Sequence, residues 1–277
     1  MIEIPEAVVL AKQLNQAIKG KRIQSVTAAG SPHKFAWFFG EPAEYDALLK
    51  GRTIEGAYPY GGRVEIEAEG GMVLNFCDGV NLRYYGGEDK LPDKHQLLVV
   101  FEDASSLVCT IAMYGGILCC KKDEPDDFYS RVAKEKPSPL SDEFDLAYFY
   151  CLFDGKSIKL SAKAFLATEQ RIPGLGNGVV QDILLGAKIH PKQKINTLGN
   201  AQKELLFESV KNTLSDMVSG GGRDIEKDLF GNPGGYITKL SKANKAMICP
   251  VCGGAVRKEN YLGGSIYYCG VCQKYTV

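Results

Sequence analysis

The chain of 277 residues is long enough for two domains with substantial cores, and its formal net charge at pH 7 is zero. No apolar run approaches the about eighteen residues of a membrane span, and no basic and apolar leader opens the chain, so we expect neither a membrane protein nor a secreted one. The charge is unevenly distributed: of the 33 Lys and Arg, 17 lie from Gly155 onward, against 9 of the 33 Asp and Glu. Unless this segregation arose by chance, the basic C-terminal half predicts a polyanion partner there rather than at the acidic N-terminal half.

The first predicted element is a helix over Pro5–Lys19. Pro5 stands near its start, Gly20 ends it, and apolar residues recur along one face at helical spacing.

Short β-rich runs come next, separated by Gly-Gly, Asp-Gly and Asp-Ala-Ser turns. Many short strands behind one helix predict a β-sandwich with a leading helix over residues 1–133. The aromatic run Trp37-Phe38-Phe39 could stack on a base, but we expect it to be buried in the sandwich. The predicted strands are Ile23–Ala28, Thr53–Pro59, Arg63–Ala68, Met72–Phe76, Asn81–Tyr85, Gln96–Phe101, Ser106–Ile111 and Gly116–Cys120.

A helical domain is predicted over residues 143–240, after a linker with two prolines at Lys134–Asp142. The charge-alternating segment Arg223–Phe230 near its end is typical of a solvated surface. The predicted helices are Glu143–Phe153, Ser161–Glu169, Val179–Leu185 and Ala201–Ser219, the last ended by three glycines.

A glycine-rich turn, Arg171-Ile-Pro-Gly-Leu-Gly-Asn177, joins two of these helices. Gly174 and Gly176 give a tight turn with little side-chain bulk, directly before the next helix. Backbone N–H groups at the positive end of that helix would face outward and could bind a phosphate, with the Asn177 amide as a further donor. Lys163, one helix earlier, could reach the same phosphate. Taken alone, the turn is weak evidence for anything beyond a loop.

Four cysteines close the sequence as two Cys-x2-Cys pairs, Cys249 with Cys252 and Cys269 with Cys272, separated by residues 253–268. Each pair puts two thiolates on one tight turn, and a hairpin between the pairs would bring all four around one structural Zn²⁺. A module of about thirty residues is too small to fold without such a metal. Two disulfides or separate buried thiols are the alternative.

The other five cysteines lie in apolar surroundings with irregular spacing. They are predicted to be buried free thiols of a reducing compartment, hence the cytoplasm. They are Cys77, Cys109, Cys119, Cys120 and Cys151.

The helix–glycine turn–helix, the following Gly186-Ala-Lys-Ile-His-Pro191 and the terminal cysteines together resemble the Fpg/Nei family of DNA glycosylases. The opening Met1-Ile2-Glu3-Ile4-Pro5-Glu6 is similar to the family's Met-Pro-Glu-Leu-Pro-Glu. The resemblance covers essentially the whole chain. It implies an α+β multidomain fold: an N-terminal β-sandwich with a leading helix, a C-terminal helix–two-turn–helix domain and a zinc finger over residues 245–277.

The resemblance also implies catalytic positions, with one departure. In the family the initiator Met is removed, the exposed Pro amine attacks the sugar, and a carboxylate handles protons. The carboxylates are here Glu3 and Glu6, but the nucleophile position is Ile2. A Met before Ile is expected to stay, which moves the α-amine by one residue, about 3.5 Å. Trimming to Ile2, or folding back of the Met1 amine, would restore a nucleophile.

The family's DNA contacts are partly kept. Lys163, Gly174, Gly176 and Asn177 match the family's phosphate-binding positions. The family's hairpin Lys, by contrast, aligns with a glycine, and Arg63 beside that glycine is the candidate substitute.

Three positions that touch DNA in the family have changed chemistry. The hairpin Lys aligns with Gly62, the Met that fills the gap left by the flipped base with Asp78, and the finger Arg with Gly264. Met113 or Tyr114 could intercalate instead. Each lost phosphate contact should weaken DNA binding.

We therefore predict a cytoplasmic, monomeric DNA-binding homologue of base-excision-repair glycosylases with AP lyase activity, one structural Zn²⁺, and damaged or abasic duplex as its partner. Because of Ile2, glycosylase or lyase activity is expected to be weak, altered or lost. The alternative is a non-catalytic nucleic-acid-binding or scaffold protein on the same fold. The loop Phe230–Tyr236 lies where the family's lesion-capping loop falls, and either holds a base or is flexible.

Overall fold

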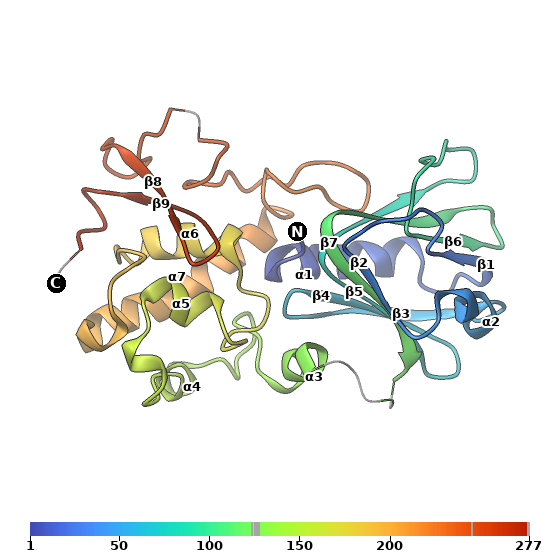
Figure 1. The fold of residues 1–277 in the computed structure, drawn as a ribbon, viewed down its shortest axis with the longest axis horizontal. Coiled ribbons are helices and arrows are strands. Elements are labelled where there is room, and N and C mark those ends of the chain that lie inside the picture. The colour runs from blue at the N-terminus through green and yellow to red at the C-terminus, as the bar shows by residue number, and fades with distance from the viewer. Residues whose placement is uncertain (123, 125–127, 245, 276–277) are drawn as a thin grey trace.

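The computed structural model describes residues 1–277 except 123, 125–127, 245, 276 and 277. A β-rich half and a helical half lie side by side, and the N-terminus lies between them (Figure 1). None of the described helices combines the length and the apolar character that crossing a bilayer requires. The predicted α+β fold, with the strands in the N-terminal half and the helices and a terminal hairpin after it, is confirmed.

After the leading helix, the described part of the N-terminal half consists mainly of strands, with the short helix α2 (Tyr45–Leu49) between two of them. Its strands are β1 (Ile23–Ala28), β2 (Ala36–Phe39), β3 (Ile54–Tyr60), β4 (Arg63–Ala68), β5 (Met72–Tyr85), β6 (Leu97–Phe101) and β7 (Ser106–Lys121). Among the described residues they form one sheet in the order β1-β6-β7-β5-β4-β3, with β2 parallel to β7. β3 and β4 extend one end of the long β5–β7 ribbon, and β6 and β1 extend the other. Both ends contribute to a single hydrophobic core.

A β-bulge interrupts the ribbon where the sequence predicted a hairpin turn. β5 and β7 are each continuous, so the separate strands predicted on either side of Asp78-Gly79 and of residues 112–115 are wrong. Asp78 has a φ of 61°, and the register shifts between Asp78 and Val80. Asp78 pairs with Gly115 and Val80 with Ile111, so three residues of β7 (112–114) lie opposite the single residue Gly79 of β5, and all three are exposed.

Helix α1 (Ile4–Ala17) joins the two halves. Its Leu10 and Leu14 belong to the core of the sheet, while Ile4 belongs to the core of the helical half. The capping box between Glu3 and Glu6 begins the helix, with Pro5 in its first turn. The predicted helix is confirmed, and it packs against β3, β4 and α7 (Asn200–Ser219).

The helical half follows a helix that the sequence did not predict, α3 (Phe128–Glu135), which covers the first residues of the expected linker. The remaining helices are α4 (Leu146–Cys151), α5 (Ala162–Ala167), α6 (Asn177–Gly186) and α7. They pack around a second core rich in Phe, Leu and Ile.

The C-terminal hairpin, β8 (Val256–Tyr261) and β9 (Gly264–Cys269), lies against α6 (Figure 1). Gln181 of α6 donates to the Ser265 carbonyl at 3.1 Å and accepts from the Tyr267 amide at 3.1 Å. This side chain therefore acts as a bridge between the hairpin and the helix.

Candidate functional site

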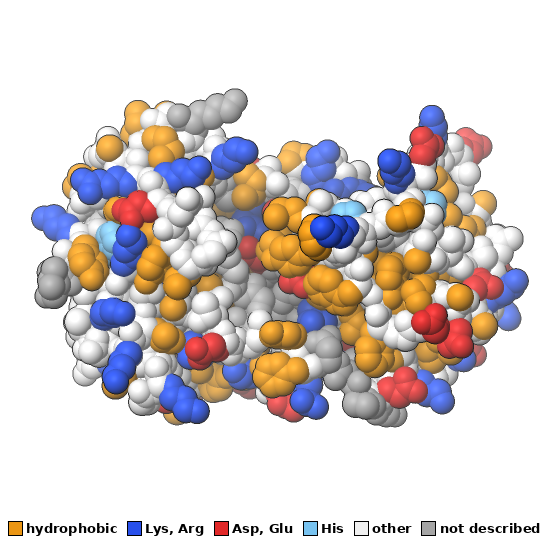
Figure 2. All heavy atoms as spheres, viewed as in Figure 1, with side chains coloured by type: hydrophobic (Ala, Val, Ile, Leu, Met, Phe, Trp, Pro, Cys, Tyr) orange, Lys and Arg blue, Asp and Glu red, His pale blue; other side chains and the backbone are white. Residues whose placement is uncertain are grey.

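A cavity of about 730 Å³ lies between the two halves. Figure 2 shows the hollow in the middle of the molecule, with hydrophobic side chains gathered along its β-rich side. Its walls come from the first three residues, the glycine-rich turn, the bulge of β5–β7, strand β2 and helix α3. The sequence-predicted residues that line it are Met1, Ile2, Glu3, Gly62, Arg63, Asp78, Tyr114, Lys163, Gly174, Gly176 and Asn177.

Glu3 closes one end of this cavity by capping α6. Its two carboxylate oxygens accept the amides of Gly178 at 2.8 Å and Val179 at 2.9 Å, and the residue is 4% exposed. A carboxylate at a helix N-terminus is favourable because the exposed N–H groups and the helix dipole are positive there. These two amides are therefore not free for a phosphate, which corrects the expectation from the turn sequence. The Asn177 side chain remains as a donor on this wall.

The guanidinium of Arg223 contacts both N-terminal carboxylates, Glu3 and Glu6. Its Nε and Nη2 donate to the two oxygens of Glu6 at 2.9 and 2.6 Å, and its Nη1 lies 3.6 Å from Glu3 Oε2. The side chain is 1% exposed, so the prediction of a solvated surface at this residue is wrong. A Cβ on Gly178 would lie 1.6 Å from Nη1, so glycine in the first turn of α6 leaves room for the guanidinium.

Burial and the neighbouring charges shift the pKa values of Glu3 and Arg223 in opposite directions. Burial raises the pKa of Glu3, while Arg223 and the two capped amides lower it, and the net shift is upward. For Arg223, burial would lower the pKa, but Glu3 and Glu6 outweigh it and raise the pKa. The guanidinium therefore stays charged, and the Glu3 carboxyl is brought closer to the range of a proton-transfer group.

The nitrogen at the family's nucleophile position is an amide. Ile2 is 5% exposed, its side chain belongs to the core of the sheet, and its N–H donates to the Asp78 carbonyl at 2.7 Å. The free α-amine belongs to Met1, which lines the cavity and pairs with Glu226 at 2.7 Å. With Met1 present, the chain thus offers a displaced primary amine held by a carboxylate.

The two candidate phosphate-binding cations both line the cavity, and each already has a protein partner. Lys163 Nζ donates to the Tyr261 carbonyl at 2.6 Å, and burial lowers its pKa. Arg63 Nη1 donates to Asn75 Oδ1 at 3.2 Å, and the residue is 8% exposed. An ammonium has three N–H donors, so the bond to Tyr261 leaves Lys163 with donors for a phosphate.

The two glycines that the resemblance aligns with the family's cations are tightly enclosed. A Cβ on Gly62 would lie 3.0 Å from the Gly174 Cα and 3.1 Å from the Ile2 carbonyl oxygen. A Cβ on Gly264 would lie 2.3 Å from Asn177 Nδ2. The hairpin tip therefore contacts the Asn177 amide directly, and a larger residue at position 264 would displace it.

The aromatic run is more exposed than the sequence predicted. Trp37 is 43% and Phe39 39% exposed, so their expected burial is wrong, whereas Phe38 packs against the core. Trp37 stacks on Tyr114, with ring centroids 6.3 Å apart and an interplanar angle of 12°. Both rings line the cavity.

The loop Phe230–Tyr236 is firmly attached. Leu229, directly before it, is fully buried in the core of the sheet and accepts the Tyr84 amide through its carbonyl. At its other end the Tyr236 hydroxyl donates to Asp182 at 3.1 Å. These contacts disfavour the alternative of a merely flexible loop.

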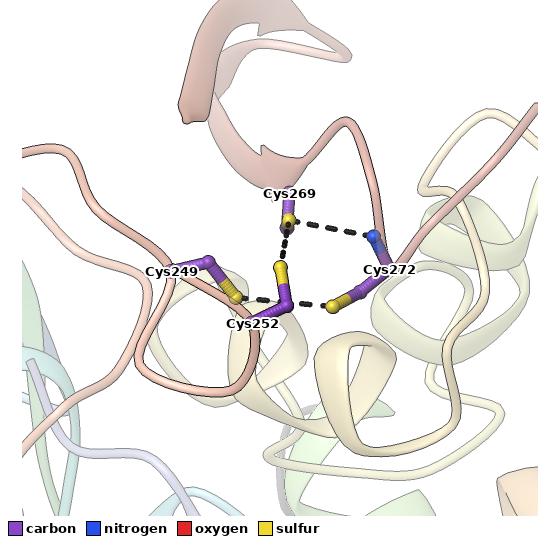
Figure 3. Close-up of side chains that lie close together, drawn as sticks. All are labelled: Cys249, Cys252, Cys269 and Cys272. Carbon is purple, nitrogen blue, oxygen red and sulfur yellow. Dashed lines mark hydrogen bonds between the residues drawn. The ribbon is translucent and has the colours of Figure 1, made fainter. Parts of the chain in front are cut away.

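The four terminal cysteines converge on one point (Figure 3). Their sulfurs all lie within 4.8 Å of one another, with Cys252 and Cys269 at 3.5 Å and Cys249 and Cys272 at 3.9 Å. Four sulfurs about 2.3 Å from a tetrahedral metal would be about 3.8 Å apart, so the spacing fits a Cys₄ site. Cys77, Cys109 and Cys119 are buried free thiols as predicted, and Cys120 is buried as well, but Cys151 is exposed rather than buried.

Comparisons with known proteins find similarity to formamidopyrimidine-DNA glycosylases along nearly the whole chain. Residues 136–228 match the model of the formamidopyrimidine-DNA glycosylase H2TH domain. The formamidopyrimidine-DNA glycosylase of Wolbachia pipientis wMel is 28% identical, over 99% of this chain and all of its own length. The chain belongs to the Fpg/Nei family.

Solved structures of the Fpg/Nei family share the fold. A Lactococcus lactis Fpg in complex with DNA that contains an abasic site superimposes with a TM-score of 0.83 at 24% identity, covering 98% of this chain and 99% of that one. The MutM (Fpg) protein of Thermus thermophilus gives a TM-score of 0.81 at 20% identity, covering 99% and 100%. At these identities the likeness establishes the fold.

Replacing Arg223 by Met should destabilise the protein by about 3–5 kcal/mol near neutral pH, because two buried carboxylates lose their cation. Arg223 lowers the pKa of Glu3, so its removal raises that pKa further. Stability that depends on a raised carboxyl pKa is present below the ordinary Glu value and is lost as the pH rises through the folded value. The deficit should therefore grow from pH 5 to pH 8 in urea unfolding. The exposed Arg131→Met is the control, and an equal deficit at both pH values would contradict this account.

Proposed function

We propose that the protein binds damaged or abasic duplex DNA in the interdomain cavity, and that the glycosylase and AP lyase chemistry of its family is weak or lost. The observation that supports the proposal has two parts. The cavity is lined by cations and an amide donor, and the nitrogen at the expected nucleophile position is a hydrogen-bonded amide. Ile2 N–H is bonded to the Asp78 carbonyl, while Lys163, Arg63 and Asn177 still line the same cavity.

DNA as the ligand is supported by the charges and by the relatives. The cavity joins cationic side chains to an amide donor, which suits a sugar-phosphate backbone. The excess of Lys and Arg from Gly155 onward adds a favourable long-range potential. Family structures with the same fold include a complex between Fpg and DNA that contains an abasic site.

Weak or absent lyase activity follows from the position of the amine. A Schiff base needs a free amine at the sugar carbon, and an amide nitrogen such as that of Ile2 cannot form one. The free amine is that of Met1, one residue before the Ile2 nitrogen, and it is ion-paired with Glu226 at 2.7 Å. Base release without a covalent intermediate would depend on Glu3, whose raised pKa suits proton transfer.

A non-catalytic role in nucleic-acid binding or as a scaffold is the second candidate. Gly62 and Gly264 favour it, because both are enclosed by backbone or by Asn177 and supply no cation. Asp78 favours it as well, because a carboxylate beside the base stack would repel phosphates.

We further propose that the bound metal is one structural Zn²⁺. Four thiolates and no other ligand type in the cluster are typical of structural zinc. Cys249 and Cys269 lie in a small core with Val256, Tyr267 and Leu185, which links the metal to the packing of the hairpin on α6.

Metal loss should release the hairpin. Cys252→Ser is expected to abolish stoichiometric zinc and to lower the thermal midpoint, because structural zinc supplies about 10–16 kcal/mol of apparent binding free energy. Zinc is counted by elemental mass spectrometry of purified protein. Cys151→Ser, an exposed cysteine outside the cluster, should keep one zinc per chain. Full zinc content in Cys252→Ser, or another metal in the wild type, would refute the assignment.

Binding of labelled abasic duplex, followed by fluorescence anisotropy, should weaken steeply as salt rises from about 50 to about 200 mM. Lys163→Met is expected to reduce the slope of log affinity against log salt by about one unit, because one phosphate contact is lost.

Two variants make this test specific. Lys163→Arg keeps the charge and should keep most of the slope, and Lys12→Met, exposed on α1, should leave it unchanged. Absence of DNA binding even at the lowest salt would remove the proposed function. An unchanged slope in Lys163→Met would show that Lys163 makes no phosphate contact.

A further inference from the structure

We propose that two buried residues, Glu65 and Asn75, position the Arg63 guanidinium in the wall of the interdomain cavity. The proposal deepens the proposed function and rests on it, because it takes Arg63 to contact a DNA phosphate there. Arg63 lines the cavity, whereas Glu65 and Asn75 do not. Both residues act through Arg63 and are therefore positioning residues.

The three side chains lie on the face of the sheet that is turned away from its core. Side chains alternate along β4, and Val64 belongs to the core, so Arg63 and Glu65 point to the other side. Helix α3 covers that side: its Ser130 is fully buried and accepts from Asn75 Nδ2 at 3.4 Å. Glu65 and Asn75 are both 0% exposed.

A chain of polar contacts runs from α3 to Arg63. Lys134 Nζ lies 2.8 Å from Glu65 Oε2 and supplies the counter-charge. Asn75 Nδ2 donates to the same oxygen at 3.1 Å, and Arg63 Nη1 donates to Asn75 Oδ1 at 3.2 Å. A carboxylate that is paired with a lysine only accepts hydrogen bonds. Glu65 therefore turns the amide NH₂ of Asn75 toward itself and the amide oxygen toward Arg63.

The strand register places this amide between the two charged side chains. β4 and β5 are antiparallel, with Glu65 opposite Asn75 and Arg63 opposite Cys77. Asn75 is therefore the direct neighbour of Glu65 and the diagonal neighbour of Arg63 on one face of the sheet, within reach of both. The backbone of the sheet sets this arrangement before any ligand arrives.

The burial of Glu65 argues for a function. A buried carboxylate loses its hydration, and an apolar side chain of similar size would avoid this penalty. Among the described residues, Glu65 Oε1 is buried without a hydrogen-bond partner, so packing alone does not explain a charge at this position. The carboxylate provides an oriented Asn75. An arginine that is already held in place loses less conformational entropy when it binds a phosphate, so its affinity is higher.

Binding of labelled abasic duplex, followed by anisotropy, tests the positioning. Arg63→Met should weaken binding and reduce the salt slope by about one unit. Glu65→Gln keeps the shape of the side chain but lets it donate as well as accept, so the Asn75 amide loses its fixed orientation. Affinity should fall by roughly 2- to 10-fold, the effect of ordering one rotamer-rich side chain on binding. In the Arg63→Met background, the same change should alter affinity by less than about twofold.

Two further variants separate positioning from charge and from folding. Glu67→Gln removes the same charge from the same face of β4, but Glu67 pairs with Lys122 at 2.6 Å, so it is the matched control and should not weaken binding. Loss of a carboxylate by itself reduces the repulsion of DNA. Asn75→Ser leaves every charge in place and should weaken binding as Glu65→Gln does. It carries the test if urea unfolding shows that Glu65→Gln does not fold.

The outcomes separate the positioning from the proposed function. An unchanged affinity in folded Glu65→Gln or Asn75→Ser, or an equal loss in the Arg63→Met background, would overturn the positioning while DNA binding stands. A loss in Glu67→Gln as large as in Glu65→Gln would overturn it as well. So would an unchanged affinity in Arg63→Met, because Arg63 would then make no phosphate contact. Absence of binding by the wild type would overturn the proposed function and the positioning together.

Discussion

The contact on which the rest of the structure depends is the capping of α6 by the Glu3 carboxylate. It joins the first residues of the chain to a helix that begins at Asn177, and it does so in a buried place where a charge is costly. Arg223 makes the arrangement stable by compensating both Glu3 and Glu6. Because these groups come from the N-terminus, α1 and the segment after α7, they fix the β-rich and helical halves in one relative position. The cavity between the halves is the consequence.

The same contact limits the chemistry that the cavity can perform. Met1 and Ile2, directly before Glu3, line the wall of the cavity. The Ile2 nitrogen is an amide that donates to the Asp78 carbonyl at 2.7 Å. The α-amine is carried past it to Glu226. The cations, the Asn177 amide and two aromatic rings line the cavity, and so does Met1, whose α-amine is paired with Glu226.

Local patterns in the sequence predicted those parts of the fold that depend on local chemistry. The cysteine spacing predicted the Cys₄ cluster because its ligand geometry is set by two tight turns and one hairpin. Helix α1 and strand β4 followed from periodicity and from their end residues. The Asp78-Gly79 pair was misread because the same residue types serve a hairpin turn and a β-bulge. Only the pairing partner across the sheet distinguishes the two.

What the sequence did not reveal depends on contacts between distant residues. Charge alternation around Arg223 is typical of a surface, and its burial results from Glu3 and Glu6, which lie near the opposite end of the sequence. Trp37 was expected inside the sandwich because large aromatic residues usually are. Its exposure results from β2 pairing in parallel at the rim of the cavity. The free amides predicted at the start of α6 were taken by Glu3, which no local pattern indicates.

In the proposed function, the chain binds DNA without the covalent step of its family. The most direct measurement is borohydride reduction of the protein with duplex that contains an abasic site, under conditions where anisotropy shows binding. Mass spectrometry of the N-terminal peptide then reads the result. We expect an intact peptide that begins Met1-Ile2 and carries no DNA. A DNA fragment covalently attached to the amine of Met1, or to that of Ile2 after loss of Met1, would contradict it.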